Sequence, residues 1–147
     1  MIKQGNVSKQ VLAHPPRRVL LFSIGGRRLA ARMEEVVGVT SWSVVVPLKN
    51  KTPFLFGLVR QDQAVLPVCD LAARLRVSVE GGHPLCLVAK HPLGNMAICI
   101  DEVMPIMQTC DTDRLRNYQA NDLPAEQSCE VDMEEIPILH MSQLLSH

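Results

Sequence analysis

The sequence predicts a mainly β protein built from two small barrels with short helices. Apolar segments of four to seven residues alternate with turns of glycine, proline and polar residues, a pattern typical of small barrels. Hydrophobic residues make up 47% of the 147-residue chain, which is enough to build a core. Because a barrel of five short strands encloses little core alone, we expect the two barrels to share an apolar seam. A third observation, an internal repeat, supports the division in two.

Residues 1–17 are polar and basic, and we expect them to form a flexible N-terminal arm. The other elements are expected to follow it in a regular order. Asp70 should cap a short helix in which Leu71 and Leu75 share one buried face. Residues 109–135 are polar and aperiodic, so we expect a long loop there, with one strand near 128–131. The β-rich segments are 18–24, 27–33, 34–39, 41–48, 54–59, 64–68, 85–89 and 96–100.

Two sequence blocks recur in the same order. "LPVCDLAARL" at 66–75 is echoed by "IPILHMSQLL" at 136–145, and "MEEVVGV" at 33–39 is echoed by "IDEVMPI" at 100–106. The offsets of 70 and 67 residues are nearly equal, which indicates a duplication. The halves would be roughly 18–80 and 81–147, with strands exchanged between them. Each half ends in a strand marked by Pro67 or Pro137, and proline belongs at strand starts, edges or bulges.

Charge and cysteine content exclude several classes of protein. The chain has 15 basic and 15 acidic residues and five aromatic side chains, which argues against nucleic-acid binding. Five cysteines, an odd number without a CxxC pair, argue against a secreted disulfide framework and favour a reducing cytoplasm. The N-terminus lacks the apolar stretch of a secretory signal, and no apolar run is long enough to span a bilayer. Any recruitment to a membrane should therefore come through a partner.

No segment carries a clear catalytic pattern. Cys69, at a predicted helix N-terminus, is either an activated thiol or, as we favour, a small buried residue. The adjacent acids at 34–35 and 101–102 fit solvated corners better than an acid–base pair. The histidines are scattered without metal-ligand spacing (His14, His83, His91, His140 and His147). We therefore expect a binding protein with no catalytic residues, no metal and no cofactor.

An ordered set of motifs resembles the CheW-like family of chemosensory coupling proteins. The segments are "LLFSIGGRRLAARMEEVVGV", "FGLV", "AVLPVCDLAARL", "ICIDEV" and "IPILHMSQLL", and together they extend from about Val19 to Leu145. The resemblance implies two intertwined five-stranded β-barrels and no enzymatic activity. It also implies an adaptor that bridges a CheA-type histidine kinase and the cytoplasmic tips of methyl-accepting receptors.

The protein-binding residues that the resemblance implies are Val36, Gly38, Phe56, Gly57 and Arg60. Here the chain departs from the family pattern. Phe56 replaces the basic residue that usually precedes the hairpin glycine, and Gly38 replaces a common acidic residue. The polar end of the hairpin is also altered, since it carries Arg60, Asp62 and Gln63. Phe56 either anchors a different partner helix or is buried.

We therefore expect a divergent adaptor in a chemosensory pathway, one that controls pilus-driven or surface motility rather than flagella. The alternative is an adaptor or inhibitor of another protein complex that uses the same fold.

Overall fold

A computed structural model describes residues 16–43, 45–47, 55–61, 63–92, 94–119 and 123–144. For Pro47, Leu55, Phe56 and Gln61 it describes the backbone alone. The elements are β1 (Arg17–Ile24), β2 (Arg27–Arg32), η1 (Met33–Glu35), β3 (Val36–Ser41), β4 (Val45–Pro47), β5 (Leu55–Gln61), β6 (Ala64–Cys69), α2 (Leu71–Leu75), β7 (Leu85–Ala89), β8 (Met96–Ile100), β9 (Ile106–Cys110), η2 (Thr112–Arg114), β10 (Leu115–Asn117), β11 (Ala125–Val131), β12 (Glu134–Leu139) and η3 (Met141–Gln143). The predicted mainly β architecture with short helices is confirmed.

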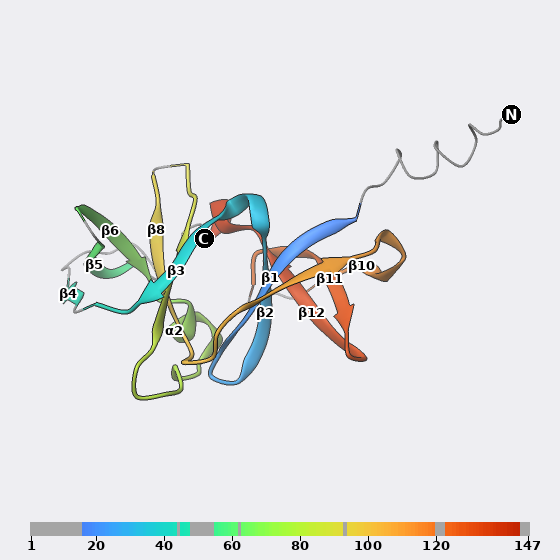
Figure 1. Ribbon diagram of the computed structural model, residues 1–147, viewed down its shortest axis with the longest axis horizontal. Coiled ribbons are helices and arrows are strands. Elements are labelled where there is room, and N and C mark those ends of the chain that lie inside the picture. Colours follow the sequence, from blue (N-terminus) through green and yellow to red (C-terminus); the bar gives the residue numbers. More distant parts are fainter. Residues whose placement is uncertain are drawn as a thin grey trace, which may run out of the picture.

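The described strands form two six-stranded sheets that lie side by side (Figure 1). The first barrel has the order β10-β11-β12-β2-β1-β9, and the second barrel has the order β3-β7-β8-β6-β5-β4. The chain builds β1 and β2 of the first barrel, crosses over to build β3 to β8, and returns for β9 to β12. The barrels are therefore intertwined, as expected. Each has a sixth strand beyond the five expected, the three-residue β4 or β10.

The two sheets have the same topology. In each, two antiparallel hairpins meet through a parallel pair, β12 with β2 in the first barrel and β6 with β8 in the second. β6 begins at residue 64 and β12 at residue 134, so 134 − 64 gives the same 70-residue offset as the sequence blocks. The repeat seen in the sequence is therefore a repeat of structure, with each barrel taking strands from both copies.

The repeated proline marks the point where a strand gains its second neighbour. Pro67 pairs with Leu58 of β5, and the parallel pairing with β8 starts one residue later, at Val68. Pro137 pairs with Ser128 of β11, and the pairing with β2 starts at Ile138. Both prolines lie inside a strand. At each of them the strand pairs with a neighbour on one side only, so the other side needs no backbone N–H donor.

Three apolar clusters account for the burial pattern. One fills the first barrel, one fills the second, and the largest lies between the barrels and includes residues of both sheets. β1 is buried on both faces, because Val19 and Leu21 join the first-barrel cluster while Leu20 and Phe22 join the shared one. The uninterrupted apolar run of this strand follows from its position at the seam.

The long loop expected at 109–135 is wrong. This segment contains the end of β9, η2, β10, β11 and the start of β12. Buried positions of β11 carry Ser128 and Cys129, which hide the apolar periodicity, and Ser128 donates its hydroxyl to Glu135 at 2.7 Å.

The cap at Asp70 is confirmed, since its carboxylate accepts the Ala73 N–H at 3.1 Å.

A disulfide joins Cys110 of β9 to Cys129 of β11. The cysteine count did not lead us to expect it. β9 is one edge of the first sheet and β11 lies next to the other edge, so the bond links the two ends of the sheet. Both cysteines are buried in the first-barrel cluster, and the disulfide therefore closes the barrel from inside.

Asp101 connects the two barrels. It follows β8 of the second barrel, and its buried carboxylate accepts N–H groups from Gly25 at 2.8 Å, Gly26 at 2.9 Å and Glu80 at 2.7 Å. Gly25 has a φ of 62°, and a Cβ there would lie 2.6 Å from that of Val77, so the turn requires glycine. Burial opposes ionisation of Asp101, but these donors and the Ser23 hydroxyl outweigh it and hold its pKa below its usual value.

Removing the disulfide should destabilise the first barrel. The two cysteines are 19 residues apart, and a crosslink of that span contributes about 3 kcal/mol to the free energy of unfolding. We expect dithiothreitol to lower the urea midpoint of the wild-type protein. In the double variant Cys110→Ala/Cys129→Ala the reductant should have no effect, and an equal effect in both proteins would contradict the assignment.

Asp101→Asn should lower the free energy of unfolding at pH 7 by about 2 kcal/mol, because an amide cannot accept from all three donors without a clash. The lowered pKa means that ionised Asp101 stabilises the fold above its unfolded pKa of about 4, and that this contribution is lost as the pH falls further. The variant should therefore show a smaller loss of stability between pH 5 and acid than the wild type, measured by urea unfolding. Asp111→Asn, an exposed position without a side-chain cap bond, is the matched control.

Candidate functional site

The sequence-predicted binding residues lie on two strands of the second barrel. Val36 and Gly38 belong to β3, at one edge of the sheet, and Phe56, Gly57 and Arg60 belong to β5, next to the other edge. Val36 is partly buried and packs against the shared core, whereas Arg60 is exposed opposite Val65. The side chain of Phe56 lies outside the described part of the structure, so its two alternatives stay open.

Both strands carry a β-bulge at these positions. The register of β3 shifts between Val36 and Gly38, which leaves Val37 as the extra residue, and that of β5 shifts between Leu55 and Gly57, which leaves Phe56. Bulges bend the strand and redirect the side chain of the extra residue, and they are frequent beside binding sites. The two segments that contain the binding residues implied by the family resemblance therefore depart from regular β-structure as well as from the family's sequence pattern.

Gly57 has a structural role. It is buried opposite Pro47 of β4, and a Cβ at this position would collide with the Val46 carbonyl oxygen and lie 2.8 Å from Cγ1 of Val45. Only glycine allows β4 to approach β5 this closely. The structure thus explains Gly57 without any partner.

An apolar groove crosses the second barrel between β3 and β6. This β3–β6 groove has a volume of about 320 Å³. Exposed apolar side chains mark the two strands, Val37 on β3 with 51% of its surface exposed and Val65 on β6 with 58%. The residues that line the groove are Val37, Gly38, Val39, Thr40, Ala64, Leu66, Val88 and Asn95. Such a groove can receive the apolar side of a partner helix.

Of the predicted site residues, the groove includes Gly38. Arg60 pairs with Val65, so strand alternation directs its side chain to the face opposite Ala64 and Leu66, which line the groove. Val36 and Gly57 do not line it. The sequence analysis missed Leu66, Val88 and Asn95, which come from three distant segments. The only local signal of Leu66 and Val88 is apolar character, which core residues share, and Asn95 is a polar residue in a turn segment.

A second exposed apolar surface follows the segment that enters β9. Val103, Met104, Ile106 and Met107 are each more than half exposed, and the first three line a cavity of about 260 Å³ beside β1. Within the described residues β9 pairs with β1 alone, so its other flank is open for pairing. We call these four residues the β9 patch. The sequence analysis did not identify it.

The titratable groups singled out from the sequence hold backbone in place. The Asp101 carboxylate accepts from the Gly25–Gly26 turn, as described above. The Glu102 carboxylate accepts from the His83 N–H at 3.1 Å, and the Glu35 carboxylate accepts from the Met141 N–H at 3.4 Å. Among the residues that the structure describes, no three histidine, cysteine or carboxylate side chains could hold a metal ion. His14 and His147 lie outside them.

No helix in the described ranges is long and apolar enough to cross a membrane.

Cys69 is buried, and that burial raises its pKa to about 12, despite the nearby Arg74 guanidinium. The thiolate fraction at neutral pH is therefore negligible, which opposes nucleophilic chemistry. We expect Cys69 to resist iodoacetamide in the native protein and to react fully in 6 M guanidinium chloride, as measured by peptide mass spectrometry. Cys99, which is partly exposed, is the internal comparison. Rapid native alkylation of Cys69 would restore the thiol hypothesis.

The chain is similar to known proteins over most of its length. Residues 18–147 match the family described as CheW-like domain. The chain is 23% identical over 106 residues to the chemotaxis protein CheW of Rhizobium meliloti (strain 1021), an alignment of 69% of this chain and 67% of that protein. It is 28% identical over 106 residues to the protein FrzA of Myxococcus xanthus, covering 63% of this chain and 66% of FrzA. The chain thus spans about two thirds of each relative.

A solved structure shows the same fold. The scaffolding protein TtCheW from Thermoanaerobacter tengcongensis superposes with a TM-score of 0.78 over 91% of each chain, at 16% sequence identity.

Proposed function

The chain belongs to the CheW-like family, and we propose that it is an adaptor that couples a CheA-type histidine kinase to methyl-accepting chemoreceptors. The family consists of non-catalytic scaffolds. The observation that carries the proposal is the presence of two separate exposed apolar surfaces, the β3–β6 groove on the second barrel and the β9 patch on the first. An adaptor needs two such surfaces, because it holds two partners at once.

The β3–β6 groove is the surface we assign to the receptor. A receptor tip is helical, and the groove offers an apolar floor from Leu66 and Val88 with Val37 at its border. Arg60 is exposed on the opposite face of the sheet, so it is not part of this surface. Gly38 leaves the groove open where the family often has an acidic residue, which supports a receptor different from the usual ones.

The β9 patch is the surface we assign to the kinase. Its regulatory domain has the same fold in this family, so it can present an edge strand to the open flank of β9. The four exposed apolar side chains would be covered in that contact. In this arrangement the protein acts in the cytoplasm and reaches membrane receptor arrays through its partners. The output we expect is pilus-driven or surface motility.

Two variants should separate the two contacts. A Cβ at Gly38 meets no atom within 4 Å, so Gly38→Leu fills the groove without disturbing the fold, and it should weaken binding of a receptor-tip fragment at least tenfold. Ile106→Asp places a charge in the β9 patch and should weaken binding of the kinase regulatory domain to a similar extent. Both affinities are measured by isothermal titration calorimetry with the cognate partners.

Each variant should leave the other affinity unchanged. Gly82→Leu is the matched control, because a Cβ there also meets nothing within 4 Å and Gly82 lies outside both surfaces. If the wild-type protein binds neither fragment, the coupling function is wrong and the adaptor serves another complex. If Gly38→Leu binds the receptor normally, the groove is wrongly assigned.

A further inference from the structure

Three buried nitrogen atoms without a hydrogen-bond acceptor gather at one end of the first barrel. They are Nε of Arg17, Nε of Arg32 and Nε2 of His140. Arg17 is the first residue of β1, Arg32 is the last of β2, and His140 directly follows β12. Each lies two residues beyond a residue of the first-barrel cluster, Val19, Ala30 or Ile138, so strand alternation places all three on the inner face.

At the opposite end of the same face, an arginine side chain does have carboxylate partners. Arg28, two residues from Ala30 in the other direction, pairs with Glu134 at 3.1 Å and with Asp132 at 3.8 Å. Among the described residues, no carboxylate lies within 4.0 Å of the guanidinium of Arg17 or Arg32. Neither guanidinium thus has a carboxylate within ion-pair distance, and a buried donor without an acceptor is costly unless something supplies one.

His140 contributes a donor to this cluster. Its Nδ1 lies 2.8 Å from Nη1 of Arg32, and since arginine can only donate, Nδ1 accepts and the ring proton is on Nε2. The nearest acceptor, the mostly exposed carboxylate of Glu126, is 3.9 Å away, beyond hydrogen-bond distance. At the equivalent position of the first repeat, Asp70 caps its helix, whereas His140 makes no cap bond to η3. The second repeat has therefore replaced a cap with a donor beside Arg32.

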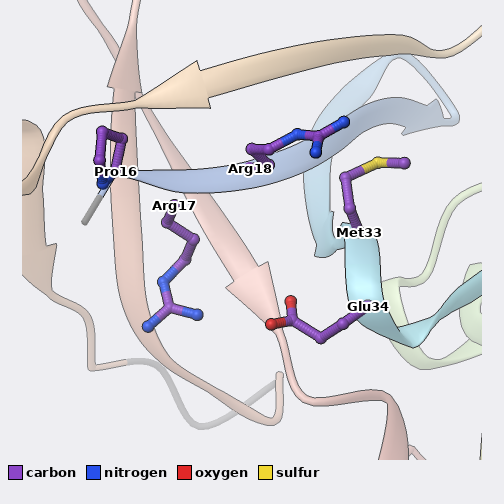
Figure 2. A pocket seen from close by; sticks show the side chains of 5 residues that line it. All are labelled: Pro16, Arg17, Arg18, Met33 and Glu34. Atoms are coloured by element: carbon purple, nitrogen blue, oxygen red, sulfur yellow. The ribbon is translucent and has the colours of Figure 1, made fainter.

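A cavity of about 580 Å³ opens at the same end, lined by Pro16, Arg17, Arg18, Met33 and Glu34. Figure 2 shows the side chains of Arg17 and Glu34 extending toward the same space, while that of Arg18 runs along β1. Arg18 lies on the outer face, where its Nη2 is 3.1 Å from the sulfur of Met107. The cavity gives a solute access to Arg17, and Glu34 is the one acidic residue in its lining.

We propose that this end of the first barrel binds a small oxyanion, a phosphate or a carboxylate, in the cavity at Arg17, on the strand next to the Arg32–His140 pair. An oxyanion supplies what the three donors lack, since it accepts several hydrogen bonds and neutralises the paired arginines. The site is separate from the β3–β6 groove and from the β9 patch, so the proposal does not depend on the coupling function.

The test uses inorganic phosphate and the full chain at constant ionic strength, set with sodium chloride. In ¹⁵N-resolved NMR spectra the Nε–H signals of Arg17 and Arg32 should shift with phosphate in a saturable manner, while that of Arg28 should not. Acetate in a parallel titration tests whether a carboxylate is sufficient. Arg17→Gln and Arg32→Gln should each weaken phosphate binding by about tenfold or more, as expected for loss of a charge-assisted hydrogen bond.

Arg28→Gln is the matched control, because Arg28 lies at the opposite end of the barrel with carboxylate partners, and this variant should bind phosphate as the wild type does. Glu34→Gln removes the acidic residue of the cavity and should tighten binding about twofold. If Arg32→Gln does not fold, Arg17→Gln at the start of β1 carries the same test. The proposal is overturned if phosphate and acetate act no differently from chloride, or if the control and site variants bind phosphate equally.

Discussion

The buried carboxylate of Asp101 is the interaction on which the arrangement of the two barrels depends. It belongs to the chain as it leaves the second barrel, yet it binds the first hairpin turn through Gly25 and Gly26. Its third donor, Glu80, precedes β7, so one side chain fixes three segments that are far apart in sequence. The shared core can form between the sheets because this contact sets where they meet. It also sets where β9 starts, only five residues later.

The sequence predicted those features that local chemistry determines. The repeated proline, the Asp70 cap and the short buried strands follow from residue type and spacing, and they were found. Within 109–135 a strand was predicted only near 128–131, and it is found as part of β11. β10 and the first three residues of β11 were missed, because these strands gain their stability from pairing with neighbours rather than from their own periodicity. The disulfide and the groove were missed for a related reason. Both join residues from strands that the topology alone brings together, as with Cys110 and Cys129 or with Gly38 and Leu66.

The duplicated barrels have diverged at their ends more than in their interiors. The second barrel opens into an apolar groove, while the first ends in arginine and histidine side chains. The interiors remain alike, filled with small and β-branched apolar residues in both cases. Duplication thus supplied two scaffolds of one topology, and substitution at strand ends gave them different surfaces. The position of His140 where the first copy has Asp70 illustrates the change in a single residue.

The disulfide also makes the two barrels unequal in how they can open. In the second barrel the strands equivalent to β9 and β11 are β3 and β5, and neither contains a cysteine that could join them. Among the described strands β3 pairs with β7 alone, so it can separate from the sheet while the other strands stay paired, as in local fraying. The first barrel keeps β9 tethered to β11 even when ladder bonds break, so it opens as a unit. The second barrel, which carries the groove, is thus the more easily opened of the two, and the crosslinked first barrel is the more rigid.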